Sequence, residues 1–235
     1  MTSGQVIIHL IFPEIIFREA AWIGLTAKEQ AQAACFRFQV DAYHWMACRA
    51  NLRKILSQAI DCKPREVPLL FSEYGKPELA APYHSLNFNL SRSNNLAIVA
   101  LNIDGPIGVD LEALDRAPDL LECETSFCHP EEMISLPLDK RSRADHLLQI
   151  WTAKEAVLKA LGTGMSHSPK TLKIFFQGQG GVAVSNPILA GIENQRLHQL
   201  HHPALVLHQA IVSAPQSIRL IKIMESPFEK RAIND

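Results

Sequence analysis

The feature that most constrains this chain is a segment that occurs twice. Trp45 to Arg53 aligns without gaps on Trp151 to Lys159, 106 residues later, with Trp, Ala, Ala and Leu at matching positions and a basic residue ending each copy. Both copies have the composition of a helix, and two apolar stretches typical of strands follow each of them. Two similar halves are therefore predicted, unless common helix residues match by chance.

The pattern of apolar residues supports the same division. The order of a helix followed by strands, repeated, predicts an α+β fold. Its two similar subdomains, each a helix packed on a small antiparallel sheet, would be related by a pseudo-twofold axis with the active site in the cleft between them. We expect one subdomain over residues 1–105 and the other over 106–235. The predicted helices are 41–60 and 143–161, and the predicted strands are 5–12, 96–101, 106–112, 172–176, 181–184, 204–213 and 218–224, with 96–101 and 106–112 forming a hairpin.

Composition excludes several classes of function. The 235 residues include 23 Lys and Arg and 24 Asp and Glu, and a net charge of −1 argues against a nucleic-acid-binding surface. We find no apolar run long enough to cross a membrane and no export signal, and the five cysteines form no paired pattern, so a cytoplasmic location is expected. The charge is nevertheless segregated, because residues 101–135 contain nine acidic residues and one basic residue.

Three carboxylates could form a metal site. Asp110 and Glu112 are two residues apart in a predicted strand, so both side chains point to the same face, and Glu155 comes from the second repeated segment. Such a group needs a cation, and Mg²⁺ prefers oxygen ligands. Taken alone, Asp110 and Glu112 favour a solvated acidic edge over a metal site, and the third carboxylate, Glu155, shifts the preference toward the metal site. Scattered basic residues that could bind a polyanion nearby are Arg49, Arg53, Lys76 and Arg92, although each could be an ordinary surface charge.

Five segments together resemble one enzyme family. Residues 107–112 (IGVDLE) and 151–159 (WTAKEAVLK) resemble the paired G-x-D-x-E and W-[ST]-x-K-E-[AS]-x-x-K motifs of the 4'-phosphopantetheinyl transferases, most closely their long, monomeric Sfp-type members. Further resemblance comes from 74–77 (YGKP), 87–93 (NFNLSRS) and 127–132 (FCHPEE). The resemblance covers about residues 25–225, and the order of the five motifs makes it specific.

The resemblance implies a reaction and roles for individual residues. Family members transfer the 4'-phosphopantetheine group of coenzyme A to a serine of an apo acyl or peptidyl carrier protein and release 3',5'-ADP. Glu155 would be the general base, with Glu132 second, and Lys159 and Lys154 would contact the transferred phosphate. The metal, Mg²⁺ or else Mn²⁺, would be bound by Asp110, Glu112 and Glu155, and coenzyme A by Arg49, Arg53, Lys76, Ser91, Arg92, Asp110, Lys154 and Lys159.

Two departures and one alternative accompany this prediction. Arg92 stands where the family usually has His, and residues 27–38 contain only two of the basic residues expected to bind the 3'-phosphate, Lys28 and Arg37. The carrier is expected to dock on exposed apolar residues of 126–138 and basic residues of 140–143, although apolar residues spaced in this way more often pack in the core. The alternative is a non-catalytic module that binds carriers or nucleotides on the same fold. A P-loop phosphotransferase is excluded because the chain has no GxxxxGK[ST] motif.

Overall fold

The computed structural model describes residues 1–13, 18–177, 181–185 and 194–225. Within these ranges it is an α+β protein with two main sheets, and no helix among them is long and apolar enough to span a bilayer. The helices are α1 (Arg18–Gly24), α2 (Ala27–Ala34), α3 (Gln39–Ile60), α4 (Glu124–Phe127), α5 (Pro130–Ser135) and α6 (Lys140–Leu161), with 3-10 turns η2 (Pro64–Glu66), η3 (Leu114–Glu122), η4 (Gly164–Ser166), η5 (Pro169–Thr171) and η7 (Pro203–Leu205).

The N-terminal sheet has the strand order β11-β1-β5-β4. Its face toward α3 contributes Phe88, Val99 and Leu101 to a core that also contains Ala47 and Leu52 of α3. Alternate residues of the same strands point to the other face of the sheet. The strands are β1 (Gln5–Ile11), β4 (Asn87–Ser93), β5 (Leu96–Asn102) and β11 (Leu220–Glu225), and a separate two-stranded sheet pairs β2 (Leu69–Phe71) with β3 (Pro77–Leu79).

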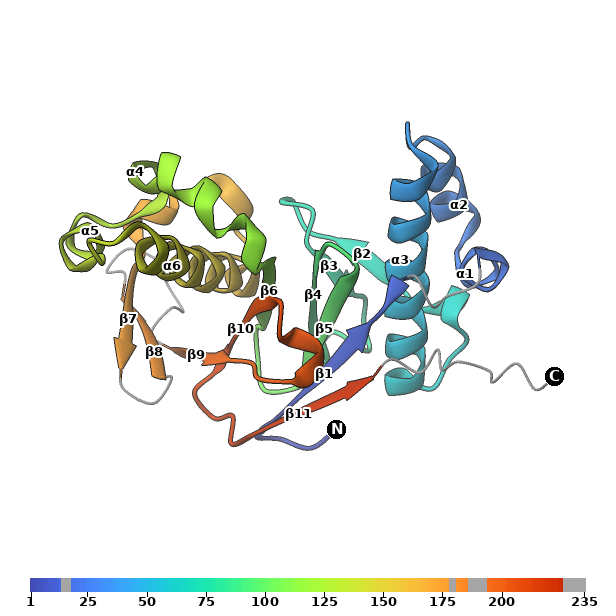
Figure 1. Ribbon diagram of the computed structural model, residues 1–235. Coiled ribbons are helices and arrows are strands. Elements are labelled where there is room, and N and C mark those ends of the chain that lie inside the picture. The colour runs from blue at the N-terminus through green and yellow to red at the C-terminus, as the bar shows by residue number, and fades with distance from the viewer. Residues whose placement is uncertain (14–17, 178–180, 186–193, 226–235) are drawn as a thin grey trace.

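The C-terminal sheet has the order β6-β10-β9-β8-β7, with antiparallel neighbours throughout. Helix α6 covers one face, where Ala153 and Val157 pack with Ile211. The other face meets the N-terminal sheet in a shared core that includes Ile8 and Val109. Figure 1 shows α3 and α6 on opposite sides of the molecule with the strands between them. The strands are β6 (Gly108–Ala113), β7 (Lys173–Gln177), β8 (Gly181–Ser185), β9 (Gln195–Gln199) and β10 (His208–Pro215).

The predicted hairpin of residues 96–101 with 106–112 is wrong. Strand β5 pairs with β1 and β4, whereas β6 pairs with β10 in the other sheet. The short connection of residues 103–107 therefore carries the chain from one sheet to the next. The hairpin partner of β5 is β4, and Asn94 at their turn adopts the left-handed conformation (φ 50°) that suits Asn.

The last two strands also differ from the expected pattern. Strand β10 pairs with β6 and β9, while β11 crosses back and pairs in parallel with β1, Ile8 opposite Ile223. Residues 220–225 thus belong to the N-terminal sheet. The division of the chain into subdomains of 1–105 and 106–235 stays a proposal. Under this division, β11 comes from the C-terminal subdomain but pairs with β1 in the sheet of the N-terminal one.

Candidate active site

The edges of the two sheets meet through side chains. Strand β6 pairs with β10 on one edge only, so the backbone N–H groups of its other edge need acceptors. Alternate side chains of β4 supply them because residues two apart in a strand share a face. Val109 N–H donates to Asn89 Oδ1 (3.0 Å), Leu111 N–H to Ser91 Oγ (3.2 Å) and Ala113 N–H to Ser93 Oγ (3.0 Å).

A glycine allows β6 to approach α6 closely. A Cβ atom at Gly108 would lie 2.0 Å from the carbonyl oxygen of Ala156 and 2.3 Å from the backbone nitrogen of Ala160. Only a residue without a side chain fits this crossing. The contact brings the carboxylates of β6 opposite the residues of the last turns of α6.

Asp110 lies at the centre of the resulting cluster. Its side chain is buried, and Oδ1 accepts hydrogen bonds from Ser91 Oγ (3.0 Å) and from Lys159 Nζ. The second oxygen, Oδ2, is buried and has no hydrogen-bond partner among the described residues. Burial raises the pKa of Asp110, although the Lys159 ammonium and the Ser91 hydroxyl act in the opposite direction.

Glu155 and Glu112 complete a group of three carboxylates. Glu155 Oε1 is buried and also lacks a partner within the described chain. Burial raises the pKa of Glu155, and the nearby charges of Asp110 and Glu112 add to the effect. Glu112 Oε1 accepts hydrogen bonds from Trp151 Nε1 (2.9 Å) and Arg116 Nη1 (2.5 Å). The three acidic side chains predicted from the sequence therefore act on one another, together with Lys159.

The donor set suits a hard divalent cation. Carboxylate oxygens are the ligands that Mg²⁺ selects, and the two buried, unpartnered oxygens on Asp110 and Glu155 are groups that a cation would satisfy. In the part of the chain that the structure describes, no three His, Cys, Asp or Glu side chains already stand in metal-binding positions. Instead, the Lys159 ammonium supplies the positive charge beside Asp110.

Lys154 and Glu132 form an ion pair with each other. Lys154 is fully buried, and its Nζ donates to Glu132 Oε2 (2.6 Å) and to the Phe127 carbonyl (2.8 Å). Glu132 accepts further hydrogen bonds from His129 N (2.6 Å) and Ile174 N (2.7 Å). Burial lowers the pKa of Lys154 and the Glu132 carboxylate opposes this. The pair fastens α5 and β7 to α6, and none of its hydrogen bonds involves Asp110 or Glu155.

Arg49 and Arg53 share one carboxylate in the N-terminal half. Arg49 Nε contacts Glu29 Oε1 (2.5 Å) and Arg53 Nε contacts Glu29 Oε2 (2.6 Å). Arg53 is buried and donates from Nη1 to the carbonyls of Pro64 (2.9 Å) and Val67 (3.2 Å). Arg53 therefore holds this half together. Arg49 stacks at 5.3 Å from the Phe71 ring, and one carboxylate for two guanidinium groups leaves a positive charge.

Lys76 and Arg92 take no part in the hydrogen bonds that the structure gives for the three carboxylates. Lys76 Nζ donates to the Ala160 carbonyl (2.9 Å) in the last turn of α6, and burial lowers the pKa of Lys76 to about 8. It thereby joins the β2–β3 hairpin to α6. Arg92 is exposed on β4, and its charge acts on Cys48 of α3. Because neighbouring residues of a strand alternate, Arg92 and Ser91 point to opposite faces.

Sequence reasoning missed four residues that shape the site. Asn89 and Ser93 accept hydrogen bonds from β6 beside Ser91, and Arg116 and Trp151 hold Glu112. Polar residues at every second position of 87–93 were a signal for the first two. Trp151 was visible as part of a motif, but its link to Glu112 spans 39 residues of sequence.

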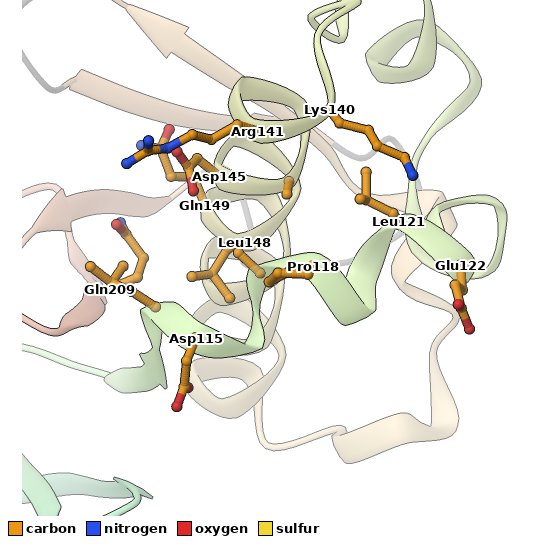
Figure 2. A pocket seen from close by; sticks show the side chains of 13 residues that line it. Asp115, Pro118, Leu121, Glu122, Lys140, Arg141, Asp145, Leu148, Gln149 and Gln209 are labelled. Carbon is orange, nitrogen blue, oxygen red and sulfur yellow. The ribbon is translucent and has the colours of Figure 1, made fainter.

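A groove lies next to this cluster, between η3 and the N-terminal half of α6 (Figure 2). Its volume is about 1090 Å³. Gln209 of β10, which lines it, stands directly opposite Glu112 in the sheet. The groove is therefore the continuation of the carboxylate-bearing face.

Comparison with known proteins places the chain in a family. A model of the 4'-phosphopantetheinyl transferase superfamily matches residues 106–212, and a model of the N-terminal part of 4'-phosphopantetheinyl transferase matches 18–103. The chain is 34% identical over 144 residues to a putative 4'-phosphopantetheinyl transferase of Synechocystis sp., an alignment covering 60% of this chain and 58% of that protein.

Two further relatives agree. The 4'-phosphopantetheinyl transferase HetI of Nostoc sp. is 36% identical over 147 residues, covering 60% of this chain and 61% of that protein. A 4'-phosphopantetheinyl transferase of Bacillus subtilis is 24% identical over 164 residues, covering 69% and 71%. The matched part thus spans less than two thirds of the first two relatives. With both family models following each other along most of the sequence, the chain belongs to the 4'-phosphopantetheinyl transferase superfamily.

Proposed function

We propose that this protein transfers the 4'-phosphopantetheine group of coenzyme A to a serine hydroxyl of an apo carrier protein and releases 3',5'-ADP. The observation that carries the proposal is the cluster of Asp110, Glu155 and Lys159. One buried oxygen each of Asp110 and Glu155, without a hydrogen-bond partner among the described residues, and the Lys159 ammonium lie at the junction of the two sheets. A binding module has no need of such a cluster, because burying unpaired carboxylate oxygens is unfavourable.

The proposed metal ligands are Asp110, Glu112 and Glu155, with Mg²⁺ as the expected ion and Mn²⁺ as a substitute. When bound, the cation would neutralise negative charge on the pyrophosphate of coenzyme A. Trp151 and Arg116 orient Glu112 by holding one of its oxygens, and Ser91 orients Asp110. Lys159, which now pairs with Asp110, would contact the transferred phosphate and stabilise charge on its oxygens.

Glu155 is the proposed general base. Its raised pKa suits a group that accepts a proton from the serine hydroxyl, and a carboxylate has two oxygens, so one can accept the proton while the other binds the cation. The serine oxygen then forms a bond to the phosphorus of the phosphopantetheine, and the bond from that phosphorus to the oxygen of 3',5'-ADP breaks. Glu132 is left out of this chemistry because its hydrogen bonds are taken by Lys154 and by two backbone N–H groups.

The nucleotide end of coenzyme A would lie toward the N-terminal half. Arg92 is exposed, and Arg49 belongs to the positively charged group around Glu29. Arginine binds phosphate through two parallel hydrogen bonds, so Arg92 can serve where the family usually has His. Lys76 could contact the nucleotide only if it broke its hydrogen bond to the Ala160 carbonyl. In this proposal Lys154 and Arg53 have structural roles and do not bind the nucleotide.

The proposed partner is an acyl or peptidyl carrier protein. Ile134 and Leu138 lie exposed in the segment expected to dock it, with relative exposures of 85% and 100%, and Lys140 and Arg141 are exposed nearby. Arg143 is instead paired with Glu124 (2.7 Å). We also propose that the protein acts as a monomer and that it works in the cytoplasm, a reducing compartment that suits its five free cysteines.

A mass measurement tests the activity. Purified protein, coenzyme A and MgCl₂ are incubated with a panel of apo acyl and peptidyl carriers, and at least one carrier is expected to gain the mass of one phosphopantetheine group. The D110N and E155Q variants should lose transfer while remaining folded by circular dichroism. E131Q is a matched control, because Glu131 is an exposed acid whose partner is Lys173. An unchanged mass for every carrier would refute the proposal, as would full activity of D110N and E155Q.

A further inference from the structure

The turn of the β2–β3 hairpin directs one lysine toward the elements that carry the carboxylate cluster. Ser72 holds this turn, because its backbone N–H donates to the Lys76 carbonyl (2.9 Å) and its Oγ accepts a hydrogen bond from the Lys76 N–H (3.1 Å). Figure 1 shows the hairpin extending from the N-terminal sheet toward α6, and the Lys76 side chain contacts the end of that helix. The backbone of Lys76 is thus fixed by hydrogen bonds within its own turn.

The Lys76 ammonium donates to carbonyl oxygens of two different elements. One oxygen belongs to Ala160 in the last turn of α6 (2.9 Å), and the other belongs to Ile107, which directly precedes β6 (3.4 Å). Carbonyl groups in the last turn of a helix lack partners within the helix, and a positive charge there interacts favourably with the helix dipole. A Cβ atom at Gly108 would lie 2.3 Å from the Ala160 nitrogen, so β6 crosses α6 at this same place.

The two carbonyl groups are close in sequence to residues of the cluster. Ala160 directly follows Lys159, and Ile107 precedes Asp110 by three residues, about 10 Å along a strand at ~3.3 Å per residue. Lys159 and Asp110 form the ion pair between α6 and β6. Because one ammonium contacts the backbone of both elements next to this pair, loss of the ammonium would free β6 and α6 to separate at their crossing.

The charge of Lys76 is unfavourable for folding. Burial lowers the pKa of Lys76 to about 8, although the nearby Glu78 carboxylate acts in the opposite direction. A lysine with a lowered pKa has a charged form that is less stable in the folded protein than in the unfolded chain. The stability of the fold therefore does not explain an ammonium group at this place, and its two contacts with the cluster-bearing elements do.

We infer that Lys76 is a positioning residue for the transfer reaction: its ammonium fixes α6 against β6 and so holds Lys159 and Asp110 in the arrangement that transfer requires. The inference rests on the proposed function. It differs from a role in binding coenzyme A, because the two hydrogen bonds described above go to the backbone of the protein itself. Under the proposed division of the chain, the same contact joins the half expected to bind the nucleotide to the half that carries the cluster.

Separate measurements of rate and affinity test this role. K76M removes the ammonium and keeps an unbranched side chain. For the wild type and the variant, kcat is measured at saturating coenzyme A with an apo carrier that the wild type modifies, per folded molecule as determined by urea unfolding. Dissociation constants of coenzyme A and 3',5'-ADP are measured by calorimetry in MgCl₂. K63M is the matched control, because Lys63 is an exposed lysine of the same half, with Glu66 as its partner (3.7 Å), and its loss removes the same charge.

We expect K76M to lower kcat at least about tenfold, because a displacement of reacting groups by about 1 Å can reduce a rate about 100-fold. Both dissociation constants should stay within about twofold of the wild type, and K63M should change neither kcat nor affinity by more than about twofold. Hydrogen exchange gives a readout that is independent of transfer. The amides of residues 107–112 and 156–162 should exchange faster in K76M than in the wild type, and those of residues 41–60 should not.

Three results would overturn the inference while leaving the proposed function intact. Binding of both ligands to K76M that is weaker by about fivefold or more would make Lys76 a ligand of coenzyme A. A wild-type kcat with unchanged affinities would show that transfer does not depend on Lys76. Unchanged hydrogen exchange in both segments would show that the ammonium does not hold α6 against β6. A wild type that modifies no carrier instead refutes the proposed function and this inference with it.

Discussion

Gly108→Ala tests whether the close approach of β6 to α6 builds the site. The added Cβ would lie 2.0 Å from the Ala156 carbonyl oxygen, whereas non-bonded heavy atoms prefer about 3.5 Å. The strand and the helix must therefore separate by about 1.5 Å. Both obstructing atoms nearest the new Cβ belong to the backbone, so no side chain can rotate away.

The expected loss is at the upper end for an overpacked core, about 3 kcal/mol. For a chain of this size that corresponds to a melting temperature lower by about 6–12 °C. The displacement also separates Asp110 on β6 from Lys159 on α6, so transfer activity should fall by more than the loss of folded protein explains.

The assays are urea unfolding and the transfer rate per folded molecule. Gly24→Ala is the matched control, because its Cβ would meet the Ala50 side chain at 3.2 Å and can be accommodated. A G108A protein within about 1 kcal/mol of wild type, with normal activity, would refute the reasoning about this crossing.

Three further variants probe contacts around the site. E132Q leaves the Lys154 ammonium buried without its carboxylate, so the free energy of unfolding should fall by about 3 kcal/mol. The folded molecules should keep their transfer rate. A variant with normal stability and lost activity would instead favour a catalytic Glu132. S91A removes the acceptor of Leu111 N–H and should destabilise by about 1–3 kcal/mol and reduce activity, as measured by urea unfolding and mass spectrometry; no effect on either would contradict the role of the β4 side chains. The pKa of Lys76 is about 8 in the folded protein and 10.5 in the unfolded chain. Between these values the unfolded chain binds more protons, so the free energy of unfolding of the wild type should rise with pH relative to that of K76M. Urea unfolding at pH 7.5 and 9.5 measures this, and an equal change with pH in both proteins would contradict it.

Much of the architecture could be predicted from local patterns. The long helices and most strands follow from apolar spacing. The predicted helices at 41–60 and 143–161 end at the same residues as α3 and α6 and begin two and three residues later than they do. The pairing of strands could not be predicted, because it depends on which sheet edges meet. The five-residue link between β5 and β6, residues 103–107, is as compatible with a crossing between sheets as with a hairpin.

The candidate site shows the same division. Alternation along β6 placed Asp110 and Glu112 on one face, and helical spacing placed Glu155 and Lys159 one turn apart. The roles of these residues in a site came from the resemblance to the family. Neither pattern could reveal what each basic residue contacts. Charge is visible in a sequence, but its partner is not.

The sequence by itself therefore determined the kind of protein: an α+β chain with a repeated helix, an acidic centre and the motifs of its superfamily. Only the tertiary structure decided which charges remain available for chemistry. Lys154 and Arg53 are buried in ion pairs with Glu132 and Glu29, whereas Lys159 reaches Asp110. The physical reason is that a buried charge must be paired, and its partner comes from whichever distant segment the packing brings within hydrogen-bond distance.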